Sequence, residues 1–275
     1  MQPDRFFDRY ALSTAIFEPV PLADVMRRFA DAGFRWVEIT ADDEHHLDPR
    51  LEVDLDRLAA LLATLGIGVH SVHATFTGLN IGHPTLGDPA VYRPLVVDSI
   101  HRAGALGAKA VVVHPASYMA PMPAGMEPDA RRISIDFIND MVEVAAAAGT
   151  RVAVENMINR GFYRYGTSMV DLAADLPDPR IGFCVDTGHA LLNKLDVSAE
   201  LRAAGDRLIS IHAANNDGTY DQHCVPTQGL IDWAEVERTL EAMRYPSRIV
   251  LEVIDRKTPA DVTFARVARL YEEIA

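Results

Sequence analysis

Cysteine is scarce in this chain of 275 residues, which contains only Cys184 and Cys224. Neither belongs to a Cys-x-x-Cys pair, so the sequence predicts no disulfide framework and no thiolate-based structural zinc site. A long apolar run is also missing, because no stretch reaches the ~18 residues that a membrane-spanning helix needs. We therefore expect a soluble protein of the reducing cytoplasm, with no membrane partner.

Basic residues are also few, because 26 Lys and Arg residues are outnumbered by 39 Asp and Glu residues, which gives a net charge of -13. This balance argues against a broad nucleic-acid-binding face, although a small basic cleft is compatible with it. The rest of the composition is typical of a globular protein, with 49% hydrophobic and 24% charged residues. No low-complexity linker divides the sequence, so we expect residues 1–275 to form a single domain.

Short β-branched segments alternate with longer amphipathic segments along the whole chain. Eight segments are predicted as strands, and several are apolar on both faces, as in a buried parallel sheet; they are residues 11–17, 36–40, 68–74, 110–115, 151–156, 181–186, 208–214 and 248–254. Helical patterns lie between them, and those at 21–33 and 54–66 each end at a glycine. Eight such units predict an α/β protein with a single (β/α)8 TIM barrel. A doubly wound sheet is the alternative, but no GxGxxG motif follows an early strand.

Ionisable side chains gather at the ends of the predicted strands or in the loops that follow. There are nine of them, namely His73, His114, Glu155, Asp186, His189, His212, Asp221, His223 and Glu252. Each could have a structural role when considered alone, but functional residues of TIM barrels collect at this end of the strands. Glu155 and Glu252 are the hardest to explain structurally, because each is a carboxylate inside an apolar run that needs a cation or hydrogen bonds to be buried.

The mixture of histidines and carboxylates suits a divalent cation such as Zn²⁺, Mn²⁺, Co²⁺ or Mg²⁺. Such a cation can polarise a carbonyl group and stabilise an enediolate, while a glutamate moves a proton between neighbouring carbons. Substrate contacts are expected from Arg160 and Arg164, which suit a phosphate or carboxylate, and from Phe76, whose ring can stack on a sugar. We therefore predict a metal-dependent enzyme. The number of ions stays open, as does the oligomeric state, for which a homo-oligomer is one option.

Five motifs of the chain lie at or after the predicted strand ends, namely VENM (154–157), VDTGHA (185–190), HAANND (212–217), the stretch from DQH to GLIDW (221–233) and LEV (251–253). They resemble motifs of the xylose isomerase-like TIM-barrel superfamily, which contains sugar phosphate isomerases and epimerases as well as endonuclease IV. The isomerases and epimerases of this group imply a small carbohydrate-like substrate. The resemblance covers nearly the whole chain and implies metal ligation by Glu155, Asp186, His212 and Glu252. From the ketose epimerases of this group, it also implies that Glu155 and Glu252 form the acid/base pair and that His189 contacts the substrate.

The resemblance leaves several functions open. The preferred one is a metal-dependent isomerase or epimerase of a sugar, ketose, polyol or keto-acid, and dehydratases and lyases of the superfamily use similar parts. The main alternative is an endonuclease IV-like multi-metal phosphodiesterase, in which additional metal ligands would be His73, His114, His189, Asp221 and His223. Two departures count against it: residues 156–166 lack the GQG-containing stretch, and the first strand lacks the histidine-serine element. A non-catalytic metal or sugar sensor ranks last.

Overall fold

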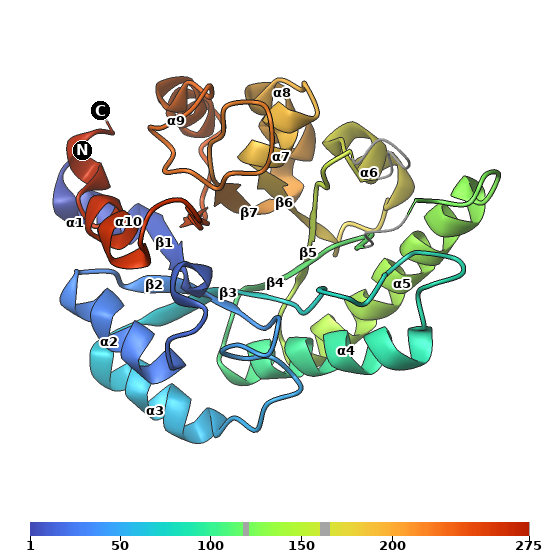
Figure 1. Cartoon of the computed structure of the whole chain (residues 1–275), viewed down its shortest axis with the longest axis horizontal. Helices are drawn as coiled ribbons and strands as arrows, with labels where there is room; N and C mark the ends of the chain where they lie inside the picture. The colour runs from blue at the N-terminus through green and yellow to red at the C-terminus, as the bar shows by residue number, and fades with distance from the viewer. Residues whose placement is uncertain (118–120, 160–165, 275) are drawn as a thin grey trace.

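The protein is seen here in a computed structural model that describes residues 1–117, 121–159 and 166–274. Within these residues, eight parallel strands close into a barrel in their sequence order (Figure 1). The strands are β1 Tyr10–Ser13, β2 Trp36–Thr40, β3 Gly68–His73, β4 Ala110–Val113, β5 Val152–Glu155, β6 Gly182–Asp186, β7 Leu208–Ala213 and β8 Ile249–Leu251. The TIM-barrel prediction is therefore confirmed.

Helices surround the barrel (Figure 1). They are α1 Pro3–Arg9, α2 Leu22–Asp31, α3 Leu55–Leu65, α4 Pro89–Ala105, α5 Glu127–Ala148, α6 Met169–Asp175, α7 Thr187–Leu192, α8 Val197–Ala204, α9 Trp233–Ala242 and α10 Ala260–Val267. Several begin where an Asp or Ser side chain accepts a hydrogen bond from the first turn, as Asp54 does for α3. Helices α3 and α5 end at Gly66 and Gly149, whose left-handed conformation glycine adopts without a steric penalty.

The first strand is shorter than the sequence pattern predicts. β1 ends at Ser13, and residues Thr14–Phe17 form a 3-10 helix instead of continuing the strand. The Thr14 hydroxyl accepts a hydrogen bond from the Thr40 backbone N–H at 3.0 Å, so a side chain replaces the next rung of the sheet. All four residues of the 3-10 helix are buried. A short buried apolar run does not by itself distinguish a strand from a helical turn, which explains the difference.

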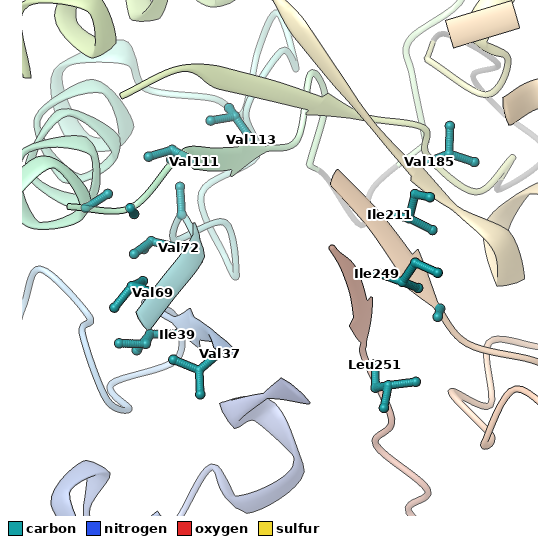
Figure 2. Close-up of a cluster of buried hydrophobic side chains, with 14 of the residues drawn as sticks. Val37, Ile39, Val69, Val72, Val111, Val113, Val185, Ile211, Ile249 and Leu251 are labelled. Atoms are coloured by element: carbon teal, nitrogen blue, oxygen red, sulfur yellow. The ribbon is translucent and has the colours of Figure 1, made fainter. Parts of the chain in front are cut away.

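Side chains that alternate along the strands supply two different layers. Val37 and Ile39 flank Glu38 in β2 and belong to the main hydrophobic cluster, which joins the strands to the helices (Figure 2). A second, smaller cluster lies on the other face of β4, β5 and β6, and its members are Ala110, Val112, Ala153 and Cys184. Because successive strand side chains point to opposite faces, polar residues in register with this inner cluster project into the barrel.

The two ends of the described chain lie beside each other (Figure 1). The Met1 ammonium group donates hydrogen bonds to the carbonyl oxygens of Tyr271 at 3.0 Å and Ile274 at 2.6 Å. None of the helices in the described ranges combines the length and the apolar character that crossing a membrane would require.

Candidate metal centre

The barrel brings all nine predicted ligands to the carboxyl ends of its strands. His73, Glu155 and Asp186 are the last residues of β3, β5 and β6. His114 and Glu252 directly follow β4 and β8, and the remaining ligands lie in β7, in α7 and in the loop after β7. The strands thus present side chains that are far apart in the sequence to one opening of the barrel.

The ligand atoms form overlapping groups, within each of which they lie no more than 4.8 Å apart. One group contains Glu155, Asp186, His212 and Glu252, another His73, His114 and Glu155, and a third His189, Asp221 and His223; a further grouping combines His73, His212 and Glu252. Most of these residues are buried, and only Asp221 and His223 are half-buried. Three of the groups share members, whereas the group of His189, Asp221 and His223 is separate from them, so the site could hold more than one cation.

Glu155 lies where the groups meet. Its Oε2 atom is 3.0 Å from Nε2 of His114 and 3.3 Å from Nε2 of His73. Its Oε1 atom is 3.1 Å from Nδ1 of His212. The two oxygens therefore face different groups, and this carboxylate could bridge neighbouring cations.

Three histidines share one arrangement, in which Nδ1 donates to a backbone carbonyl oxygen: His73 to Ala74 (3.0 Å), His189 to Asn156 (2.8 Å) and His223 to Glu252 (3.1 Å). A carbonyl only accepts, so these contacts place a proton on Nδ1 and turn Nε2 toward the carboxylates. Metal-binding histidines are typically oriented through the second ring nitrogen in this way. The backbone therefore preorganises three of the candidate ligands.

His212 is oriented differently. Its Nδ1 atom faces Glu155 at 3.1 Å and Glu252 at 3.2 Å, and its Nε2 atom lies 3.1 Å from Oε2 of Glu38. Glu38 is fully buried in β2, and Ser71 donates to the same Glu38 oxygen at 2.7 Å. The sequence analysis missed Glu38, although WVEIT places a carboxylate in an apolar run just as the segments around Glu155 and Glu252 do.

Asp186 caps a helix and also faces the site. Its Oδ1 atom accepts a hydrogen bond from the His189 backbone N–H at 2.7 Å at the start of α7, while the side chain of Asn156 pairs with both backbone groups of Asp186, at 2.7 and 3.0 Å. The Oδ2 atom of Asp186 is buried and has no hydrogen-bond partner among the described residues. Helix capping by Oδ1 and metal binding by Oδ2 are therefore both compatible with the geometry. Asn156 is a second site residue that the sequence analysis missed, although it belongs to the VEN motif.

Buried charges shift the pKa values of the site in opposite directions. Burial raises the pKa of Asp186 to about 7. Burial lowers the pKa of His73, but the hydrogen bond and charge of Glu155 more than reverse this and raise it to about 9. Burial likewise lowers the pKa of His223, but the hydrogen bond and charge of Asp221 outweigh this effect and raise the pKa to about 9. Without a cation, protons on His73 and His223 offset part of the carboxylate charge, and a bound cation would replace such protons.

The residues present fit a divalent cation. Two buried carboxylate oxygens, Asp186 Oδ2 and Asp221 Oδ1, lack a hydrogen-bond partner in the described part of the chain, which is costly unless a ligand completes the site. The donors are imidazole nitrogens and carboxylate oxygens, a set that suits Zn²⁺, Mn²⁺ or Co²⁺. Several carboxylates in one buried site also need positive charge to offset their desolvation.

A cavity of about 110 Å³ adjoins the candidate ligands. Phe76, Met157 and Ile158 contribute its apolar lining. The Phe76 ring lies 4.1 Å from the His114 ring, measured between centroids, so this predicted substrate residue does lie at the site. Arg160 and Arg164, the other two predicted substrate residues, fall outside the described residues.

A TIM barrel with histidine and carboxylate donors at the ends of its strands defines the class of this protein. The model of the family described as xylose isomerase-like TIM barrel matches residues 26–273, and the chain belongs to this family. The sequence-based resemblance to that group is therefore confirmed.

The chain is similar over most or part of its length to several individual proteins. An uncharacterized protein of Methanocaldococcus jannaschii is 26% identical over 248 residues, which cover 89% of this chain and 83% of the relative. A probable endonuclease 4 of Campylobacter concisus is 26% identical over 157 residues, or 54% of this chain and 52% of the relative. Among solved structures, a D-tagatose 3-epimerase-like protein superposes with a TM-score of 0.80 at 22% identity, covering 97% of this chain and 98% of the other. That last likeness concerns the fold.

Proposed function

We propose that the protein is a divalent-metal-dependent isomerase or epimerase of a small sugar or a related ketose, polyol or keto-acid. The observation that carries this proposal is the approach of Glu155 and Glu252 to the same nitrogen of His212, at 3.1 and 3.2 Å. The two carboxylates come from β5 and β8, which are not neighbours in the barrel. Together with Asp186 they would hold a cation and flank a substrate bound beside it.

The chemistry would divide between the cation and the protein. A bound divalent cation polarises a substrate carbonyl and thereby makes the adjacent carbon more acidic. Glu155 and Glu252 are placed to remove a proton from one face of that carbon and to return one to the other face, as general base and general acid. Phe76, Met157 and Ile158 would exclude water from the reacting carbon.

The charge of the loops around the site supports a small substrate over a nucleic acid. The loop after β7, residues 214–231, contains Asp217 and Asp221 but no Lys or Arg. The loop after β2 begins with the acidic residues Asp42, Asp43 and Glu44. Acidic charge on these two loops would weaken the attraction to a polyanion such as DNA, although the segment after β8 carries Arg256 and Lys257.

A second candidate, a multi-metal phosphodiesterase, is favoured by one specific observation. Oδ2 of Asp221 lies 3.4 Å from Nε2 of His189 and 2.8 Å from Nε2 of His223, so these three residues could hold a cation in addition to the first. Sites with neighbouring cations are common in enzymes that cleave phosphate esters. The match to a probable endonuclease 4 adds support from sequence.

Solvent proton exchange tests the proposed function. Protein purified without chelator would be analysed for metal and incubated in D₂O with a panel of ketoses and keto-acids, and NMR would follow deuterium incorporation. We expect metal-dependent incorporation at the carbon next to the carbonyl group. The contrary result would be a protein that exchanges no proton with any member of the panel and cuts an abasic duplex in a chelator-sensitive reaction. That result would overturn the proposed isomerase function in favour of the phosphodiesterase. Net loss of water from the substrate would instead identify a dehydratase.

A further inference from the structure

We propose that Glu38 is a positioning residue that holds His212 in the orientation required for binding the cation. The inference rests on the proposed metal site and concerns how that site is built. It assigns a role to a buried carboxylate that touches neither the cavity nor the other carboxylates of the site.

The geometry leaves Glu38 on the far side of the His212 ring. His212 and Glu38 are both fully buried, and Nε2 of the ring lies 3.1 Å from Glu38 Oε2. A carboxylate only accepts hydrogen bonds, so Nε2 carries the proton and donates it. On the opposite side of the ring, Nδ1 faces Glu155 and Glu252, and a cation held there would take the place of the proton on Nδ1.

The irregular pairing of β2 with β3 holds Glu38 in place. The register between these strands shifts after Val37, so that Glu38 lies opposite Ser71 instead of His70. Ser71 then donates to Glu38 Oε2 at 2.7 Å, and His212 donates to the same oxygen. This oxygen is thereby fixed from two sides.

Glu38 is hard to explain as a stabilising residue. Its Oε1 atom is buried and has no hydrogen-bond partner in the described ranges of the chain. The neighbouring His70 supplies no compensating charge, because burial lowers its pKa to about 4 despite the charge of Glu38. A buried carboxylate with one unpartnered oxygen is weak evidence for a stabilising role, because its desolvation opposes what its hydrogen bonds contribute.

The other histidines provide the contrast. His73, His189 and His223 donate to backbone carbonyl oxygens, which are neutral. Among these four histidines, only His212 has a carboxylate, rather than a backbone carbonyl, at the ring nitrogen that faces away from the candidate ligands. A carboxylate at the second nitrogen raises the basicity of the ligating nitrogen and fixes the ring, and replacing such partners typically lowers metal affinity by about 10–100-fold. Glu38 would thus strengthen the one histidine that lies between both proposed acid/base residues.

The test measures metal affinity and coordination instead of turnover. Glu38→Gln keeps the shape of the side chain and removes its charge. Binding of Zn²⁺ and Co²⁺ would be measured by competition with a chromophoric chelator, and the Co²⁺ absorption spectrum would report the coordination of the ion. We expect the variant to bind about 10–100-fold more weakly at one cation equivalent, with an altered Co²⁺ spectrum. Ser71→Ala, which frees Glu38 to move, should shift both readouts in the same direction by a smaller amount.

The control is Glu237→Gln, which neutralises another buried carboxylate, one that pairs with Arg9 and Tyr10 away from the site. It should leave both metal readouts at their wild-type values. Wild-type affinity and an unchanged Co²⁺ spectrum in both Glu38→Gln and Ser71→Ala would overturn the role of Glu38. A wild-type protein that binds no cation would instead overturn the proposed function, and absent isomerase activity alone would leave the test of Glu38 intact.

Discussion

At the scale of single residues, the candidate site depends on carboxylates that each contact several groups. Glu155 alone faces His73, His114 and His212. Burial would raise its pKa, but the histidines hold it well below the usual range, so the carboxylate is ionised at neutral pH. An ionised carboxylate can bind a cation or accept a proton from a substrate held beside it.

Glu155→Gln and Glu252→Gln should each reduce turnover by about 10²-fold or more, because each variant removes a proposed base or acid. Circular dichroism and thermal unfolding should show that the barrel remains folded. The comparison requires saturating metal, since both side chains are also proposed ligands. A variant that turns over at the wild-type rate would exclude that residue from proton transfer.

Asp42 provides a prediction about stability and pH. Burial would raise its pKa, but its carboxylate accepts hydrogen bonds from Thr75, Phe76 and Thr77, which lower the pKa below its usual value. Because the folded pKa is lower than the unfolded value of ~3.9, the contribution to stability is present above about pH 4 and is lost as the pH falls. Asp42→Asn should therefore destabilise the protein by about 1–3 kcal/mol at pH 7.

The difference between Asp42→Asn and the wild type should narrow below about pH 4, as measured by denaturant unfolding at a series of pH values. Asp43→Asn is the matched control, because the neighbouring Asp43 is exposed. A difference in stability that stays constant down to pH 3 would contradict this origin of the effect.

Most of the site residues could be predicted because the sequence places polar groups at the ends of apolar runs. Glu38 shows the same signal but lies in the middle of β2, so the focus on strand ends excluded it. Asn156 could not be recognised, since its role depends on Asp186, a residue of the next strand. The substrate roles of Arg160 and Arg164 stay predictions, as do the catalytic and metal-binding roles of the nine ligands.

At the scale of helices and strands, the periodicity of apolar residues predicted the long helices, but it did not predict the short ones. α3 follows the predicted pattern at 54–66 to its terminal glycine, and α2, Leu22–Asp31, lies within the predicted pattern at 21–33. α1 and α7 have only 7 and 6 residues, too few for a helical period to emerge. β8 is also shorter than predicted and ends at Leu251, so Glu252 follows the strand.

The packing of α4 against α5 yields a prediction at this scale. A Cβ atom at Gly104 would collide with the carbonyl oxygen of Ala148, which is backbone and cannot swing aside. Gly104→Ala should therefore lower the free energy of unfolding by about 1–3 kcal/mol, although alanine favours a helix by ~1 kcal/mol. Urea unfolding would measure the change.

Gly66→Ala separates the effect of backbone strain from that of packing. Gly66 has a φ of 68° and open space around its Cβ position, so its replacement costs only the left-handed conformation, about 1 kcal/mol. A Gly104→Ala variant as stable as the wild type would show that the two helices can separate without cost.

At the scale of the whole molecule, cation binding should contribute to stability. The proposed ligands come from different strands, so only the folded barrel presents them together, and a cation at 100 times its Kd would stabilise the fold by ~2.7 kcal/mol. We expect the Tm to fall on chelation and to recover on adding Zn²⁺ or Mn²⁺, with Ca²⁺ as the control. If chelator leaves the Tm of a metal-containing sample unchanged, cation binding does not contribute to the stability of the fold.

The barrel as a whole was predictable because its strand–helix unit occurs eight times, and each unit shows the same alternation of a short β-branched segment and a longer amphipathic segment. Other properties of the whole molecule are not encoded in such a local pattern. A single domain over residues 1–275, a cytoplasmic location and the oligomeric state therefore stay predictions.

The order of the ligands along the chain also has a consequence for synthesis. β8 pairs with both β7 and β1, and Glu252 directly follows it. A nascent chain on the ribosome would already display His73 and His114 long before the carboxylates of β5, β6 and β8 emerge. An early ion would meet only part of the proposed ligand set, so capture of the proposed cation would wait until the last strand closes the barrel.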